Sequence, residues 1–163
     1  MKIKRAVGTL AMTALVALAV AAPAVGAQPQ EQRFTTTIDV STGEATVVAS
    51  GLINATGVGV ETSSRPAGRT YHASDDLIFD AGTIHIETTA PDRSAFDPST
   101  CTLTLHAHGP YVITGGDGAY AGSAGNGSFT VSGTIQFEQT IDGCDFEHAS
   151  GTQIIEAIGT MKI

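Results

Sequence analysis

The sequence predicts an all-β protein that forms either a closed antiparallel barrel or a β-sandwich. Apolar and polar residues alternate with a period of two, as at residues 34–40 and 129–137, which is typical of strands with one buried face. Short connections rich in Gly, Pro and Asp separate these strands. No segment after the first 27 residues keeps helical spacing for three turns. A closed barrel would also leave no strand edge exposed.

The first 27 residues have the pattern of a secretory signal peptide. Lys2, Lys4 and Arg5 precede an apolar run over residues 10–20, and small residues lead from there to Ala27. An apolar run of this length is much shorter than the roughly 20 residues that a membrane-spanning helix needs. We therefore predict cleavage after Ala27, a secreted protein, and a single barrel domain over residues 28–163.

The charge balance argues against two classes of partner. Three of the eight Lys and Arg residues lie in the predicted signal peptide, so five would remain against sixteen Asp and Glu, and 5 − 16 gives a formal charge of −11. This charge repels nucleic-acid phosphates and anionic head groups, and the remaining basic residues form no patch. We expect neither a nucleic-acid partner nor membrane binding after cleavage. The acidity is explained by the solubility of an exported protein.

Seven strands are predicted in the mature chain. They are expected over residues 33–40, 44–60, 76–88, 101–108, 110–115, 128–139 and 151–162. The second contains Gly51, Gly57 and Gly59, where a strand can bend or bulge.

The two longest connections, residues 62–75 and 90–100, are predicted to be loops. The first groups Arg65, Arg69, Tyr71 and His72. Such a group would suit an anionic ligand at a barrel mouth, and it would equally suit an ordinary polar surface loop, which we favour.

Two cysteines, Cys101 and Cys144, are predicted to form a disulfide. An even pair in an exported protein favours this, and only one connectivity exists. Two cysteines alone do not make a zinc site, and the C-x-x-C redox motif is absent. In the chain-entropy model, closing a loop of this length stabilises the fold by roughly 4 kcal/mol.

The densest glycine segment covers residues 109–133 and holds eight of the nineteen glycines. Gly116, Gly118 and Gly122 are spaced one residue too widely for the dinucleotide-binding fingerprint, and no Gly-Lys-Ser/Thr follows. Backbone geometry explains the composition better, because glycine permits positive φ, bulges and close approach between chains.

Residues 115–125, with the sequence GGDGAYAGSAG, resemble the G-G-T/S-G-x-F/Y-x-x-A-x-G signature of the allene oxide cyclase and dirigent barrels. The stretch from 75 to 145 is similar to small exported bacterial proteins of that type, although Asp117 replaces the usual Thr or Ser. The resemblance implies an eight-stranded antiparallel barrel, lipocalin-like in architecture, with a central cavity. In plant members that cavity shapes a reactive ligand so that it cyclises or couples. The matching residues of the turn motif are Gly115, Gly116, Gly118, Tyr120 and Gly125.

Four polar residues on two predicted strands form a candidate metal site. His106 and His108 would point to one face of their strand, as would His85 and Glu87 on theirs. If the two strands paired as a hairpin, three imidazoles and a carboxylate would meet and suit zinc or copper. The alternative, which we favour, is that these residues form solvent-facing halves of alternating strands. No metal or other cofactor is therefore expected.

No constellation of residues compels a reaction, so the catalytic residues are unknown from the sequence. Glu87, Glu138 and Glu156 would supply a general acid and base only if they faced a shared cavity. We predict a non-catalytic exported barrel that binds a small apolar ligand or a surface partner. The alternative is a cyclase or isomerase that acts through cavity shape. An enclosed cavity with convergent ionisable groups would favour this alternative.

Overall fold

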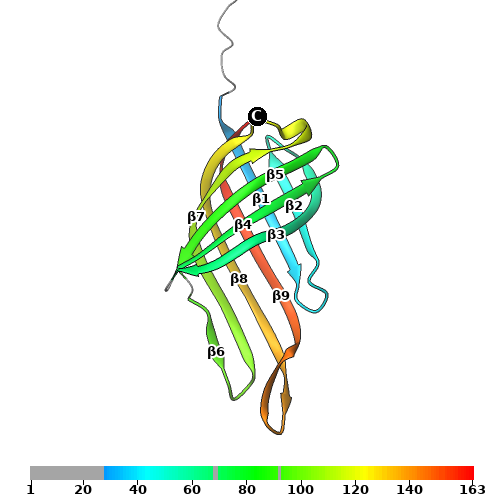
Figure 1. Cartoon of the computed structure of the whole chain (residues 1–163), viewed down its shortest axis with the longest axis vertical. Helices are drawn as coiled ribbons and strands as arrows, with labels where there is room; N and C mark the ends of the chain where they lie inside the picture. Colours follow the sequence, from blue (N-terminus) through cyan, green and yellow to red (C-terminus); the bar gives the residue numbers. More distant parts are fainter. Residues whose placement is uncertain (1–27, 68–69, 92) are drawn as a thin grey trace, which may run out of the picture.

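The computed structural model describes residues 28–67, 70–91 and 93–163 (Figure 1). The predicted signal peptide and Arg69 lie outside the described residues. Strands take up most of the described chain, and the single helical element is a short 3-10 helix, η1 (Gly118–Tyr120). The strands are β1 (Gln30–Asp39), β2 (Ala45–Gly51), β3 (Ala55–Ala67), β4 (Thr70–Phe79), β5 (Gly82–Pro91), β6 (Ala95–Asp97), β7 (Thr102–Gly116), β8 (Ala124–Thr140) and β9 (Gly143–Lys162).

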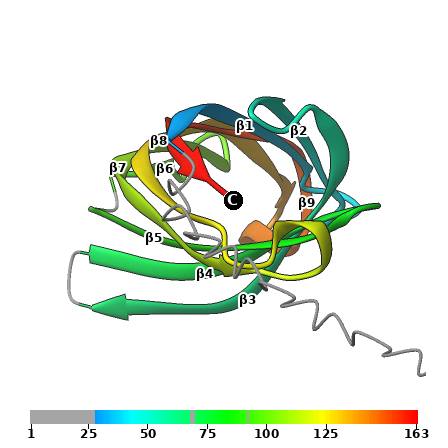
Figure 2. The same ribbon diagram turned by 90° about the horizontal axis from the view of Figure 1, so that it is seen from above.

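Eight of these strands close into an antiparallel barrel (Figure 2). The order β5-β4-β3-β2-β1-β9-β8-β7 returns to β5 through the pairing of β5 with β7, and β6 is an extra strand on the same edge of β7 as β5, where it pairs with residues 102–104. Neighbours around the barrel follow one another along the chain, except where β6 is inserted and where β9 meets β1. The prediction of a small closed antiparallel barrel is confirmed, and the sandwich is excluded.

The predicted loop over residues 62–75 is wrong, because β3 and β4 run through it as a long hairpin. Its polar sequence hid the strands, since much of β3 is exposed beyond Val60. The predicted strand 44–60 is instead β2 and β3, which are separated by a turn at residues 52–54. In that turn Asn54 donates a side-chain hydrogen bond to the Gly51 carbonyl at 2.9 Å.

Three further predictions differ from the structure. The predicted strand 76–88 is the end of β4 and most of β5, which are separated by a turn at residues 80–81. The predicted strands 101–108 and 110–115 are one continuous strand, β7, which begins at Thr102 and whose exposed Pro110 still lies in register with Ser128 of β8. The predicted loop over residues 90–100 contains β6, which pairs with β7 through Phe96 and Leu103. In the latter two cases the pairing with neighbouring strands decides the conformation more than the local Pro and Asp signals do.

The core fills the upper part of the barrel. Every second residue of the barrel strands points inward, which places Phe34, Val47, Ile84, Tyr111 and Met161 in the interior with 2% exposure or less. A closed barrel of eight strands is just wide enough to be filled by side chains or to hold one small ligand. The packing of these large residues fills the upper end of the barrel, and Phe34 and Tyr111 also form part of the cavity wall.

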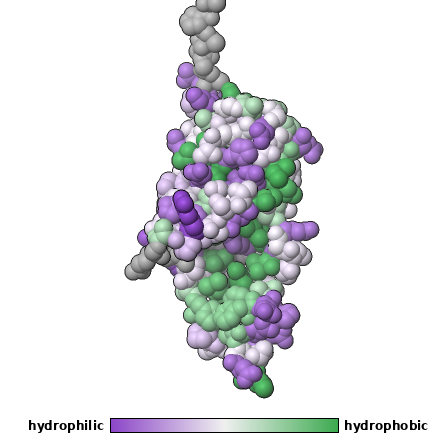
Figure 3. Space-filling view, in the orientation of Figure 1, coloured by the Kyte–Doolittle hydropathy of each residue, from purple (hydrophilic) through white to green (hydrophobic). Residues whose placement is uncertain are grey.

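Strands β7, β8 and β9 continue below the barrel as an extension, together with β6 (Figure 1). Cys101 and Cys144 form the predicted disulfide there, with Cα atoms 5.4 Å apart. Beside it Phe146 packs on Phe96 and Phe137, with ring centroids 5.4 Å and 4.9 Å away. Apolar side chains gather on the face of the extension seen in Figure 3. None of the helical segments among the described residues has the length and apolar character to cross a membrane.

Candidate functional site

The glycine-rich turn motif closes the upper end of the barrel. A Cβ at Gly116 would meet the Thr83 carbonyl oxygen at 2.7 Å, and one at Gly118 would meet the Ala81 carbonyl oxygen at 2.6 Å, so glycine is required where the turn crosses the start of β5. Tyr120 is buried beneath the turn and packs edge-on against Phe79 at 5.9 Å. The motif therefore forms a structural plug at this end of the barrel.

Below this plug the barrel holds a cavity of about 430 Å³. The strands β5 and β7 pair as far down as Thr88 and Tyr111. The cavity continues beyond this last pair, where its lining includes Pro91, Ser94 and the exposed His106. The cavity thus opens at the lower end of the barrel, toward the extension. Most of its wall is apolar, and comes from Phe34, Ile38, Ala45, Ala73, Leu77, Ile86, Ala90, Leu105, Ala107, Phe129, Val131, Ile155 and Ala157.

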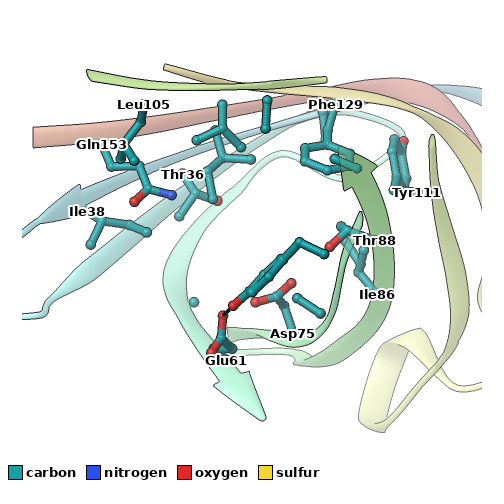
Figure 4. Close-up of a pocket in the computed structure, with 18 of the residues that line it drawn as sticks. Thr36, Ile38, Glu61, Asp75, Ile86, Thr88, Leu105, Tyr111, Phe129 and Gln153 are labelled. Carbon is teal, nitrogen blue, oxygen red and sulfur yellow. Dashed lines mark hydrogen bonds between the residues drawn. The ribbon is translucent and has the colours of Figure 1, made fainter. Parts of the chain in front are cut away.

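Two carboxylates and a phenol lie on one wall of this cavity. Glu61 of β3 and Asp75 of β4 are directly opposite each other in the strand register, and both line the cavity. Tyr71 lies four residues before Asp75 on the same face of β4, and its hydroxyl donates a hydrogen bond to Glu61 Oε2 at 3.1 Å. Figure 4 shows Glu61 and Asp75 side by side, across the cavity from Thr36, Leu105 and Gln153. Like charges opposite each other on a strand pair are destabilising, so this arrangement needs a reason other than folding.

Among the groups on this wall, Asp75 has the most strongly shifted pKa. Burial, the Glu61 carboxylate and the Asp76 carboxylate raise the pKa of Asp75 from 3.8 to about 6. Burial also raises the pKa of Tyr71, whose hydroxyl therefore stays protonated at neutral pH. The wall can accept hydrogen bonds from a ligand, attract a positive charge, or exchange a proton near neutral pH.

A second polar group lies in the cavity wall at Tyr111. Its side chain is 1% exposed, and its hydroxyl has no hydrogen-bond partner among the described residues. Burial raises the pKa of this phenol, which keeps it a neutral donor. A buried hydroxyl without a partner costs about 1–3 kcal/mol, so it is an unusual feature of a native core.

The strand register does not bring together the candidate cluster of three histidines and Glu87, which the sequence offered as the less favoured alternative to solvent-facing strand halves. His85 lies opposite Gly115 and Glu87 opposite Val112, whereas His106 and His108 occur lower on β7 and lie opposite Ser132 and Thr130 of β8. The hairpin that this cluster required does not form, because β6 and a connection intervene between β5 and the lower half of β7.

His85 has other partners on the outer face of the barrel. Its Nδ1 lies 2.7 Å from Asp76 Oδ1, and its Nε2 lies 3.4 Å from Asp117 Oδ2 in the turn motif. The hydrogen bond with Asp76 is the main cause of a raised pKa at His85. Asp117 thus joins the turn to β5 through this imidazole.

The three glutamates considered for acid–base chemistry do not share a cavity. Glu87, Glu138 and Glu156 are all exposed, and none lines the barrel cavity. Glu138 instead approaches Asp145 and His148 on the extension, where candidate ligand atoms lie within 4.8 Å of one another. His148 Nδ1 already lies 2.7 Å from Asp145 Oδ2 in this exposed group.

The predicted loop group separates to opposite faces of the β3–β4 hairpin. Tyr71 faces the cavity, whereas His72 hydrogen-bonds Thr89 Oγ1 through Nδ1 at 2.9 Å and the exposed Arg65 lies opposite it in register. The sequence interpretation missed Glu61 and Asp75 as site residues. The signal that could have found Asp75 is its position two residues before the buried Leu77, because residues two apart on a strand lie on the same face.

The geometry defines this protein as a small closed β-barrel with an apolar cavity and an acidic wall. No family model, curated protein or solved structure matches the chain. The closed barrel is what defines the class of this protein.

Proposed function

We propose that this protein is an exported barrel that binds a small, largely apolar molecule in its cavity without transforming it. The observation that carries the proposal is the cavity of about 430 Å³ with a mainly apolar wall. Its size falls within the roughly 300–1,000 Å³ typical of small-molecule sites. Each methylene group that a ligand buries there contributes about 0.8 kcal/mol, which makes apolar ligands the natural occupants.

Export is part of the same proposal. The basic, apolar and small-residue pattern of the first 27 residues supports it. The disulfide between Cys101 and Cys144 agrees with an oxidising compartment. N-terminal sequencing of the protein recovered from the medium of its producing cells should begin at Gln28, and recovery of an intact N-terminus from the cells alone would contradict export.

Ligand binding can be tested with the apolar fluorophore N-phenyl-1-naphthylamine. Its emission should increase when it enters the cavity of the wild-type protein and should decrease again on addition of a competing alkyl compound. Ala107→Phe fills the cavity from β7 and should abolish the increase. Ala119→Phe is the matched control, because Ala119 is exposed in η1 and lies outside the lining. Equal fluorescence in all three folded proteins would exclude binding in the barrel.

A second candidate function is a cyclase or isomerase of the allene oxide cyclase or dirigent type. The acidic wall favours it, because a carboxyl group with a pKa near 6 beside a carboxylate and a phenol can exchange protons at neutral pH. The resemblance of residues 115–125 to those barrels supports the same function.

The two functions differ in what happens to a co-purifying molecule. An isomerase conserves mass, so an inactive variant retains an unconverted isomer of the same mass with a different chromatographic retention time. If Asp75→Asn and wild-type protein from the producing cells carry the identical molecule, binding without conversion is supported. A change of isomer between the two proteins would favour catalysis.

A further inference from the structure

Two carboxylates face the cavity without a basic side chain to balance them. None of the described residues that line the cavity is Lys or Arg. The one described lining imidazole, His106, comes from β7 next to Leu105, which Figure 4 shows across the cavity from Asp75. Glu61 and Asp75 are instead in register with each other, so the charge on this wall is concentrated at one place.

Only one of the two carboxylates on this wall receives a hydrogen bond from a described residue. Tyr71 donates its one hydroxyl hydrogen to Glu61. Among the described residues, none donates a hydrogen bond to the Asp75 carboxylate. A half-buried carboxylate normally gains a donor or a cation, because its desolvation is otherwise uncompensated. The Tyr111 hydroxyl, buried in the same cavity wall, also lacks a partner.

We propose that the molecule bound in the barrel is an organic ammonium ion, a small apolar body that carries a protonated amine. This inference rests on the proposed binding function and names its ligand class. The ammonium group binds between Glu61 and Asp75, where its hydrogens supply the donors that Asp75 lacks. The apolar body occupies the space between Leu77, Ile86, Val131 and Ile155.

A metal ion fits this wall less well than an ammonium group. Calcium takes six to eight oxygen ligands, and magnesium needs six in octahedral geometry. The described lining near Asp75 offers two carboxylates and the phenol of Tyr71, and beyond them the wall becomes apolar at Ala73 and Leu77. A single charge attached to a hydrocarbon matches both parts of the cavity.

Three probes of equal chain length test the proposal by titration calorimetry at pH 7.5 and low salt: n-octylammonium, n-octanol and n-octanoate. We expect n-octylammonium to bind at least about tenfold more tightly than n-octanol, and n-octanoate to bind most weakly. Asp75→Asn and Glu61→Gln should each reduce the preference for ammonium over alcohol severalfold and leave n-octanol binding nearly unchanged.

The matched control is Asp76→Asn, which removes the same charge from the adjacent residue. Asp76 faces His85 on the outer surface, and its carboxylate is only the third of the three causes that raise the pKa of Asp75, so this variant should keep most of the ammonium preference. If n-octanol binds and n-octylammonium binds no better, the ammonium proposal is overturned and the binding function stands. If none of the three probes binds, the binding function fails with it. If Asp76→Asn lost as much of the preference as Asp75→Asn, the preference would reflect only the net charge of the protein, and the proposal would also be overturned.

Discussion

Asp75 places a carboxyl group in the cavity at a cost to the stability of the folded protein. Its carboxyl group points into the barrel beside a second carboxylate, and its pKa is raised from 3.8 to about 6. Because the folded protein holds this proton more tightly than the unfolded chain, stability falls as pH rises from about 4 to about 6. Above that range the ionised carboxylate reduces the free energy of unfolding by a constant amount.

Asp75→Asn should therefore stabilise the empty protein at pH 7.5. A pKa change of this size corresponds to at most ~3 kcal/mol, and solvent at the open mouth reduces it to on the order of 1–2 kcal/mol. The gain should shrink toward zero at pH 4, where the folded wild type is already protonated. Urea unfolding at both pH values measures it. Asp76→Asn, which loses the hydrogen bond to His85, should show no such gain, and a pH-independent effect of Asp75→Asn would contradict the account.

Tyr111 offers a second test at the residue scale. Since its buried hydroxyl has no partner among the described residues, Tyr111→Phe should leave the free energy of unfolding unchanged or raise it by about 1 kcal/mol. Tyr71→Phe is the comparison, because that hydroxyl already bonds Glu61 and its loss brings no gain. Destabilisation by Tyr111→Phe in thermal unfolding would show that the hydroxyl is satisfied in the empty protein.

At the scale of the elements, strands β8 and β9 need glycine at the place where the Tyr111 ring packs against them, because a side chain there would collide with the ring or with the neighbouring strand. Gly127 and Gly159 are in register, and a Cβ on Gly127 would come 2.6 Å from Tyr111 Cε1 and would also overlap the Ile158 carbonyl oxygen. Gly127→Ala should therefore destabilise the protein by about 1–3 kcal/mol. Gly115→Ala is the matched control, because the nearest atom to its Cβ would be His85 Cδ2 at 3.8 Å. Equal unfolding midpoints for the two variants would contradict this packing.

The disulfide is expected to stabilise the extension and the barrel together. Cys101 and Cys144 are separated by 43 residues and join the start of β7 to the start of β9, across the end of β8. Replacing both with Ala should lower the free energy of unfolding by roughly 4 kcal/mol in the chain-entropy model. Hydrogen exchange should then show the residues around Phe137 and Phe146 opening before the barrel does. Uniform opening of the whole sheet would indicate that the extension is not a separate unit.

The elements that alternation predicts well are those with one buried face. Residues 33–40 and 128–139 were placed correctly because Phe34 and Phe129 mark a regular inward face. The β3–β4 hairpin was not, because Ser63 and Ser64 follow a β-bulge and carry no apolar pattern. The site was missed for the same reason: Glu61 and Asp75 point inward, where the pattern predicts apolar residues.

At the scale of the whole molecule, the closed barrel was predictable and the contents of its interior were not. Regular alternation predicts a barrel or a sandwich, and only the resemblance of the glycine turn implies a central cavity; the structure has a closed barrel that holds one. Which histidines and carboxylates meet depends on the register and on the point where β5 leaves β7, and neither is encoded by local spacing. His85 and His106 therefore lie apart, whereas Glu61 and Asp75 lie directly opposite each other.

The central claim, that the barrel interior binds a small apolar molecule, is tested most directly by methyl NMR during titration with n-octanol. Leu77 and Ile155 line the cavity, while their chain neighbours Ile78 and Ile154 are about 40% exposed on the outside. We expect saturable shifts at the methyl groups of Leu77 and Ile155, with those of Ile78 and Ile154 nearly unchanged. Shifts confined to the outward residues, or none at saturating n-octanol, would contradict the account.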